Sequence, residues 1–336
     1  MKTTHLGAAY DIKVPDTKAF TITTKEDFIQ LHAVVLAVAK RGTGKTLSLT
    51  NLLRMMKENN ALDRLILVSP TYHNNKKMFE GLPLDEDVDV IEPDKGTADT
   101  IMEILEQEGK EYDEYHEALK RYRLLMRLIH SNRPIEDIPS DLILEFGEYN
   151  FKKPEHKWGG RKPIITVFFD DCQGNALFRP SSKLSSLVIK HRHQGKTKDG
   201  AIGVTLFFAT QTYTSNAAGL LPAIRNNTTH LLVFRNKNNK EIDLIAEEVA
   251  GEVEKETFFA LHNFAVQDPH DFLFIDLAKK KEHPSMFRRN FNEFILIEPN
   301  NNKTSADDNK HGSKQATGTG DGNERNNKGN IKREIK

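Results

Sequence analysis

The chain has 336 residues, a formal net charge of +0 and a single cysteine. This length suits one large α/β domain or two smaller ones, one cysteine excludes an intramolecular disulfide, and overall neutrality confines any basic nucleic-acid-binding surface to a local patch. No apolar run approaches the length of a membrane span, and residues 1–5 contain no signal-peptide core. We therefore expect a soluble, intracellular protein with no membrane partner.

A phosphate-binding loop is predicted by the first strong motif. The apolar run Ala33–Val38 predicts a buried strand, and a helical pattern begins near residue 45. The motif between them reads Ala39, Lys40, Arg41, Gly42, Thr43, Gly44, Lys45, Thr46 and Leu47. A strand, a glycine-containing loop and a helix N-terminus form the Walker A site that holds phosphates. We expect it to bind a nucleoside triphosphate, with Lys45 on the outer phosphates and Thr46 on Mg²⁺.

One position of this motif departs from the usual pattern. Ala39 stands where glycine is typical, and alanine fits there if its φ is negative. The alternative is a chance match in a glycine-containing loop, which the flanking elements disfavour. The helix that follows places its leucines and a methionine on one face, at Leu49, Leu52, Leu53 and Met56.

Further strands and helices predict the α/β fold of a P-loop NTPase, with a mostly parallel central sheet flanked by helices. The expected strands are Arg64–Val68, Val88–Ile91, Ile164–Phe169, Val204–Ala209, Thr229–Phe234 and Phe272–Leu277. We assign this ATPase domain to residues 1–299. Residues 300–336 are rich in polar and charged residues and nearly lack large apolar side chains, so we expect a disordered tail.

An insertion is predicted at about residues 97–160. Residues 97–130 are highly charged and contain no proline, and their apolar residues suggest one or two amphipathic helices. Residues 132–160 contain scattered proline and charge and predict a loop-rich connection. Two interpretations remain open for this insertion: a solvated helical cover, or a surface that docks a partner.

The second half of an ATPase site is predicted where the apolar strand Ile164–Phe169 ends in Asp170 and Asp171. At this Walker B position Asp170 would bind Mg²⁺, and Asp171 would act as the general base that polarises the attacking water. Gln211 follows another core strand and could contact the γ-phosphate or the water. The alternatives are an exposed strand-end turn for the two acids and an ordinary turn glutamine for Gln211.

Two basic features invite functional interpretations. Arg225 could act across a subunit boundary as an arginine finger, although a surface salt bridge is an equal alternative. Residues 179–198 carry six cations and no acid, which suits contact with DNA phosphates; a solvated basic loop is the other interpretation. The candidate DNA-binding residues within it are Lys190, Arg192, Lys196 and Lys198.

Taken together, these motifs resemble those of one family, the genome-packaging ATPases of large DNA viruses, virophages and Polinton-like elements, within the FtsK/HerA superfamily of P-loop motors. The similarity covers roughly residues 20–298. The segments that carry it are Ala39–Thr46 with Arg41, Phe169–Asp171, Lys190–His193, Ala209–Tyr213, Leu221–Asn227, Phe272–Leu277 and Phe287–Phe291. The block from Gln211 to Asn227 contributes most of the family assignment.

The resemblance implies a DNA-stimulated ATP hydrolase that drives double-stranded DNA into a viral capsid. It implies a homo-oligomeric ring, a hexamer or pentamer, that meets capsid or portal proteins in the host cytoplasm or a viral factory, or on the virion. In this family pattern Asp171 would be the base, Gln211 a sensor and Arg225 a candidate finger acting in trans. A related DNA helicase, a nucleotide-binding switch and a non-motor assembly factor are the alternative functions.

Overall fold

The computed structural model describes residues 29–131, 134–214, 220–236, 238–249 and 253–297. The tail expected at residues 300–336 lies outside this part of the chain. Within the described residues, none of the helices combines the length and the apolar character needed to cross a membrane.

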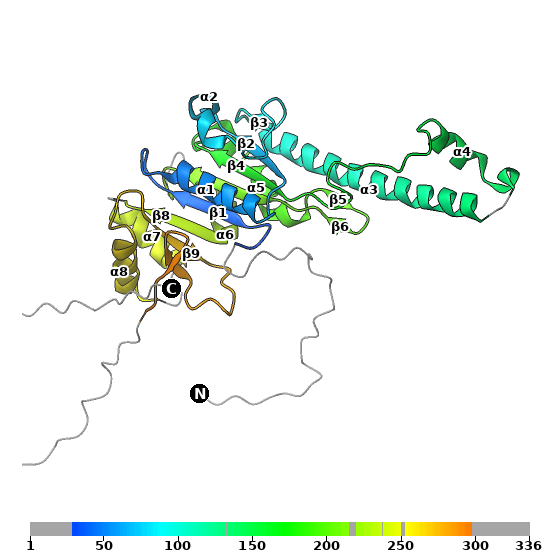
Figure 1. Ribbon diagram of the computed structural model, residues 1–336. Helices are drawn as coiled ribbons and strands as arrows, with labels where there is room; N and C mark the ends of the chain where they lie inside the picture. Colours follow the sequence, from blue (N-terminus) through cyan, green and yellow to red (C-terminus); the bar gives the residue numbers. More distant parts are fainter. Residues whose placement is uncertain (1–28, 132–133, 215–219, 237, 250–252, 298–336) are drawn as a thin grey trace, which may run out of the picture.

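A nine-stranded sheet forms the centre of the molecule, in the order β11-β10-β9-β8-β1-β7-β4-β2-β3 (Figure 1). Its strands are β1 Val34–Val38, β2 Arg64–Val68, β3 Val90–Ile91, β4 Ile165–Asp170, β7 Thr205–Thr210, β8 His230–Phe234, β9 Phe272–Asp276, β10 Phe287–Arg289 and β11 Glu293–Phe294. All residues of β1, β4, β7, β8 and β9 are buried. Burial on both faces explains why these strands are almost continuously apolar.

Strand direction divides the sheet into two parts. The six strands from β8 to β3 pair in parallel, whereas β9, β10 and β11 pair antiparallel at one edge. The predicted mostly parallel sheet is confirmed, but the apolar strand at residues 272–276 runs antiparallel to β8. The apolar sequence of this strand predicted that it is buried, but such a pattern does not indicate whether a strand pairs in parallel or antiparallel. A separate two-stranded hairpin is formed by β5 (Lys196–Thr197) and β6 (Gly200–Ala201).

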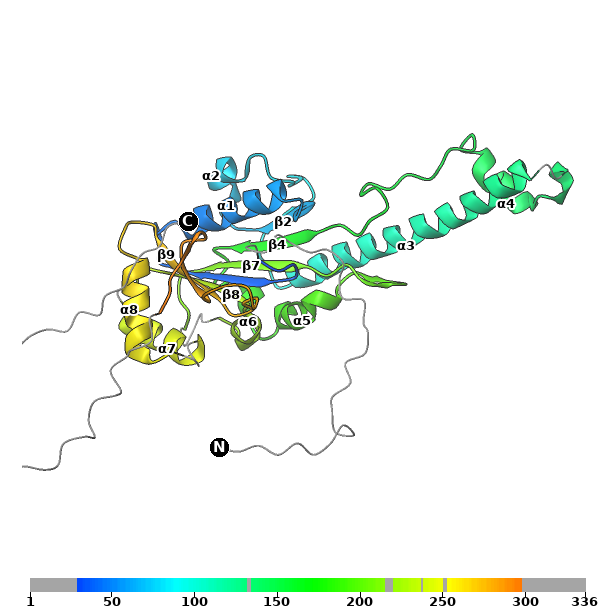
Figure 2. The ribbon, with the colours of Figure 1, turned by 60° about the horizontal axis from the view of Figure 1, so that its bottom comes forward.

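Helices cover both faces of the sheet (Figures 1 and 2). They are α1 Lys45–Glu58, α2 Tyr72–Asn75, α3 Thr97–His130, α4 Ser140–Gly147, α5 Leu184–Lys190, α6 Pro222–Asn227, α7 Asn239–Val249 and α8 Lys255–Ala265. The predicted apolar face of α1 packs on one side of the sheet. The start of α3 and helices α5, α6, α7 and α8 pack on the other side.

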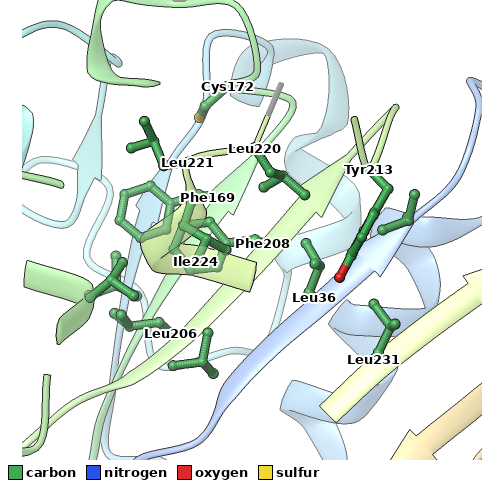
Figure 3. Packing of buried hydrophobic residues seen from close by; sticks show 14 of the residues in the cluster. Leu36, Phe169, Cys172, Leu206, Phe208, Tyr213, Leu220, Leu221, Ile224 and Leu231 are labelled. Carbon is green, nitrogen blue, oxygen red and sulfur yellow. The ribbon is translucent and has the colours of Figure 1, made fainter. Parts of the chain in front are cut away.

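On the side of the sheet covered by α5 to α8, aromatic rings pack near the ends of β4 and β7. Phe169 and Phe208 stack with ring centroids 4.7 Å apart and an interplanar angle of 5°, and Ile224 lies beside them in Figure 3. Cys172 is buried, its thiol donates to the carbonyl of Val68 at 3.2 Å, and burial raises its pKa. It therefore behaves as a small core residue at the strand end.

The insertion forms an arm that projects away from the sheet (Figures 1 and 2). We use "arm" for residues 110–160. Its main element is the distal part of a single helix, α3, which has 34 residues in all and a length of about 50 Å. The segment expected to be a loop-rich connection contains α4, which packs on the distal part of α3 through a small core of Leu125, Ile138, Leu142 and Phe146.

The root of the arm is fixed by charge and by close packing. Glu108 of α3 is 1% exposed and accepts hydrogen bonds from Arg64 of β2, Lys157 and the Trp158 indole at 2.7, 2.6 and 2.8 Å. A Cβ at Gly109 would lie 2.5 Å from the Lys196 carbonyl oxygen. Only glycine permits this approach of α3 to β5, so the helix leaves the body in a defined direction.

Candidate nucleotide-binding site

Three neighbouring parallel strands bring the predicted motifs together at their carboxyl ends, which form one edge of the sheet across the strand direction. Strand β7 lies between β1 and β4, with Val38 paired to Thr210 and Ala209 paired to Asp170. The carboxyl ends of the three strands therefore meet. Ligands of open α/β sheets bind outside the carboxyl ends of the strands, which is where this edge gathers the Walker A loop, the two aspartates and Gln211.

The backbone of the Walker A loop adopts positive φ angles at its two glycines. Gly42 and Gly44 adopt φ values of 81° and 97°, and α1 begins directly afterwards at Lys45. Ala39 does not have a positive φ, as expected for an alanine at that position, and its N–H donates to the Thr210 carbonyl at 3.0 Å. The loop thus leaves β1 while still attached to β7.

Thr46 and Asp170 face one another beside this loop. The Thr46 hydroxyl donates to Asp170 Oδ1 at 2.8 Å. Asp170 is 1% exposed, and burial raises the pKa of its carboxyl, partly opposed by Thr46 and the nearby Lys45. A hydroxyl and a buried carboxylate are oxygen ligands of the kind that Mg²⁺ takes. The residues predicted to hold Mg²⁺ therefore fit that ion in chemistry and position.

Asp171 meets the other two predicted catalytic groups. Gln211 Nε2 donates to Asp171 Oδ1 at 2.7 Å, and Lys45 Nζ lies 3.8 Å from the same oxygen. Asp171 has a left-handed φ of 53°, so the chain turns sharply where β4 ends and the adjacent carboxylates point to different partners. Asp171 is the more accessible of the two, with a side chain 38% exposed.

Gln173 is a residue that sequence reasoning missed. Its Oε1 accepts from the backbone N–H groups of Gln211 and Thr212 at 2.8 and 3.1 Å. Its Nε2 donates to the carbonyl and hydroxyl oxygens of Thr212 at 3.0 and 2.8 Å. One side chain thus ties the loop after β7 to the loop after β4. The only signal in the sequence was a polar residue two positions after Asp171.

His270 is a second missed residue, and it comes from the far end of the chain. Its Nδ1 donates to the Thr43 carbonyl at 3.1 Å, and the ring lies 3.2 Å from the position that a Cβ would take at Gly44. Residues 266–271, between α8 and β9, are held by Arg289, which pairs with Asp268 and Asp271. No local pattern linked this segment to the Walker A loop.

Arg225 is engaged within its own chain. Its guanidinium lies 3.0 Å from Glu248 of α7 and stands over the Tyr213 ring at 5.7 Å. The Tyr213 hydroxyl also donates to Glu248, at 2.6 Å. This is the salt-bridge alternative expected for Arg225, and the role as a finger in trans stays a prediction.

The basic segment crosses a face of the sheet in α5, and its candidate DNA-binding residues, 190–198, follow at the amino ends of the strands, away from the nucleotide site. It precedes β7, and His191 within it bonds through Nε2 to the carbonyl of His32, just before β1. Lys190, Arg192, Lys196 and Lys198 are all exposed. However, Lys198 pairs with Glu117 of α3 at 2.9 Å, and Lys183 pairs with Asp99 at 2.5 Å. The segment lacks acids in its own sequence, but α3 supplies them from elsewhere.

Comparison with known proteins adds one family match. A family model described as "AAA domain" matches residues 26–129, less than half of the chain. No curated protein matches the chain.

Several solved structures are similar to the chain at low identity. The genome packaging NTPase B204 from Sulfolobus turreted icosahedral virus 2 has 10% identity and a TM-score of 0.38, covering 74% of this chain and 93% of that one. EssC (ATPases 2 and 3) from Geobacillus thermodenitrificans has 13% identity and a TM-score of 0.40, covering 77% of this chain and 39% of that one. The pCW3 conjugation coupling protein TcpA has 14% identity and a TM-score of 0.37, covering 78% and 62%.

One of these neighbours is a viral genome packaging NTPase, the kind of protein whose motifs the sequence resembles. The fold assignment itself is carried by the molecule's own geometry: the strand order, the left-handed glycines of the Walker A loop and the two aspartates at the end of β4. The chain has the fold of a P-loop NTPase domain, with a mostly parallel sheet flanked by helices.

Proposed function

We propose that this protein hydrolyses ATP and uses the free energy to translocate double-stranded DNA into a viral capsid. The observation that carries the hydrolytic part is the convergence of Lys45 and Gln211 on one carboxylate oxygen of Asp171, beside the Walker A loop. A cation can hold the phosphates, a carboxylate can act as base and an amide donor can orient the attacking water in phosphoryl transfer.

In this mechanism the loop backbone and Lys45 hold the phosphates. Asp171 accepts the proton of the attacking water while Gln211 Nε2 orients the carboxylate and the water. Thr46 and Asp170 would hold Mg²⁺, which offsets phosphate charge when bound. Asp170 is committed to Thr46 and buried, whereas Asp171 is accessible, so the two adjacent acids divide the roles of ligand and base.

Gln211 would also report the state of the nucleotide. It changes partners if Asp171 turns toward water, and Gln173 links its backbone to the loop after β4. Movement at the γ-phosphate would therefore pass to the segment that contains Tyr213 and, through Glu248, to Arg225. In a ring, release of Arg225 from Glu248 would free it to act on a neighbouring subunit.

DNA packaging is the finer part of this proposal. It is supported by the sequence motifs shared with viral packaging ATPases and by the name of one structural neighbour, a genome packaging NTPase. The proposal includes a homo-oligomeric ring, hexameric or pentameric, capsid or portal partners, and location in the host cytoplasm, in a viral factory or on the virion.

The test is ATP hydrolysis by the purified protein with and without linear double-stranded DNA, at about 50 and about 200 mM salt. We expect DNA to raise the turnover rate and salt to reduce that stimulation, because phosphate contacts release counterions. Turnover that is indifferent to DNA at both salt concentrations would contradict the translocase proposal and favour an assembly factor. Absence of turnover would contradict the enzyme assignment itself.

A further inference from the structure

The distal half of α3 carries a basic face that the predicted site residues did not include. Lys120, Arg123 and Arg127 are spaced by three and four residues, so they lie on one side of the helix. All three side chains are exposed. Residues 118–131 contain no aspartate or glutamate. In a chain with equal numbers of acidic and basic residues, this is a local concentration of positive charge. We call these three residues the basic face.

Several other cations of the arm form ion pairs. Arg121, on another side of the same helix turn, pairs with Asp141 and Glu145 of α4. Lys157 pairs with Glu108 and Glu111. Among the ion pairs formed by the described residues, none involves Lys120, Arg123 or Arg127. Arg121 and Lys157 are thus neutralised by ion pairs that stabilise the arm, whereas the basic face remains accessible.

The position of the basic face suits a long polyanion. The distal half of α3 stands clear of the body (Figures 1 and 2), and α4 covers a different side of the helix, through the core around Leu125. The face from residue 120 to residue 127 extends about 10 Å along the helix. Its three cations are held in one row by a helix whose root is fixed at Glu108 and Gly109.

We infer that the basic face of the arm binds the phosphate backbone of double-stranded DNA at a distance from the nucleotide site. This inference rests on the proposed function, in which DNA is the partner, and adds a second contact outside the ATPase body. The three cations, which flank the exposed Leu124, gain affinity for a polyphosphate chiefly by releasing its counterions. This exposed row of three cations complements the negative charge of a phosphate backbone, so nucleic acid is the occupant that this face favours.

The experiment compares the full-length protein with two variants that each remove three positive charges. The test variant is K120Q/R123Q/R127Q. The control is K77Q/K95Q/K281Q, which removes exposed lysines of the body that form no ion pair among the described residues. Glutamine has a helix propensity close to that of lysine and arginine, so α3 should be preserved, as checked by far-ultraviolet circular dichroism. Binding of a short fluorescein-labelled duplex is measured by anisotropy across a salt series.

Each phosphate contact contributes about 0.9 to the slope of log K against log salt concentration. Loss of three contacts should therefore flatten the slope by up to about 2.7. Between about 50 and about 200 mM salt, the wild-type affinity should consequently fall about 40-fold more than that of the test variant. The control variant should retain the wild-type slope, and ATP hydrolysis without DNA should be the same in all three proteins.

Failure of this inference is distinguishable from failure of the proposed function. If the wild type binds DNA but the test variant keeps the same slope and affinity, the basic face is not a DNA contact, and an acidic protein becomes the candidate occupant. If the control flattens the slope as much as the test variant, the arm has no special role. If the wild type itself binds no duplex, the translocase proposal fails before the arm is considered.

Discussion

The nucleotide edge of the sheet and the arm are built in opposite ways. At the edge, Lys45, Asp171 and Gln211 are far apart in sequence and come within hydrogen-bonding or ion-pairing reach because buried parallel strands end together. The arm is mostly one continuous helix, stabilised by a small local core and attached at its root. The nucleotide site therefore depends on packing between segments that are distant in sequence. The distance that the arm extends from the body depends on local helix formation. Changes in one region should therefore spare the other.

The largest expected effect is at Asp171. Asp171→Asn should keep ATP binding, because an amide oxygen can still accept from Gln211, but the turnover number should fall by about 10²–10⁴-fold since a general base is lost. Steady-state hydrolysis and equilibrium nucleotide binding measure the two effects separately. Full turnover in this variant would remove Asp171 from the role of base.

Lys45→Ala should weaken ATP binding on the order of 100-fold, because a charge-assisted contact to phosphate is worth about 1.5–3 kcal/mol. Lys120→Ala is a matched control that removes one charge from the arm. It should leave ATP affinity and hydrolysis without DNA unchanged. Equal loss of ATP affinity in both variants would break the separation between edge and arm.

Gln173 should act as a positioning residue. Gln173→Ala removes the four hydrogen bonds to residues 211 and 212, and a misplaced Gln211 should lower the turnover number by about 10–100-fold with little change in KM. Gln173→Glu keeps an acceptor for the two N–H groups and should lose less.

A double mutant gives the decisive control for Gln173. Once Gln211 is replaced by alanine, Gln173→Ala should cost little further activity, because the two residues act as one unit. Additive losses would show that Gln173 does not work through Gln211. A lower melting temperature with unchanged turnover would reduce its role to stability.

Leu125→Ala tests the independence of the arm. Leu125 is 0% exposed in the arm core, and truncation of a buried leucine costs about 2–5 kcal/mol. Hydrogen exchange should accelerate in residues 119–147 and remain unchanged in β1, β4 and β7. Hydrolysis without DNA should persist. A parallel loss of hydrolysis would show that the arm and the site form one cooperative unit.

The smallest expected effect is the loss of folding stability at low pH. Burial lowers the pKa of His32 and His230 in the body to about 4. The unfolded chain therefore binds more protons between about pH 4 and pH 6.5, and the stability of the body should fall as the pH drops through that window, by at most about 3 kcal/mol for fully buried His230. His230→Gln should flatten this slope.

The arm should respond to acid in a lower window. Lys157 lowers the pKa of Glu111, and Lys198 lowers that of Glu117, so these pairs stabilise the arm above the usual glutamate pKa and are lost only as the pH falls below it. Trp158, the only tryptophan, reports the root of the arm by fluorescence, while circular dichroism reports the whole fold. Loss of the Trp158 signal before the body unfolds would reverse this order.

Much of the nucleotide site was readable from the sequence, because its parts are local motifs. An apolar strand followed by glycines, Lys45 and Thr46 is recognisable in eight residues, and two aspartates at a strand end are recognisable in two. Gln173 and His270 were not predicted, because they belong to no local motif. Their importance lies in contacts 38 and 227 positions away along the chain, and nothing in their neighbours indicates those partners.

The basic residues show the same limit. Counting charges within residues 179–198 pointed to a free basic patch, yet α3 places Asp99 and Glu117 against two of its lysines. A further accessible row of cations lies on α3, within a stretch whose many charges hid their arrangement along the helix. Ion pairing between distant segments is a property of packing, and composition alone cannot assign it.

The sequence by itself determined the buried apolar strands, the phosphate-binding loop and the pair of acids, because backbone propensity, apolar periodicity and glycine geometry act over a few residues. Only the tertiary structure decided the antiparallel edge, the direction of the arm and the meeting of Lys45, Asp171 and Gln211. Those features depend on which strands pair and which surfaces bury each other, and such long-range contacts are fixed by the free energy of the whole fold rather than of any one segment.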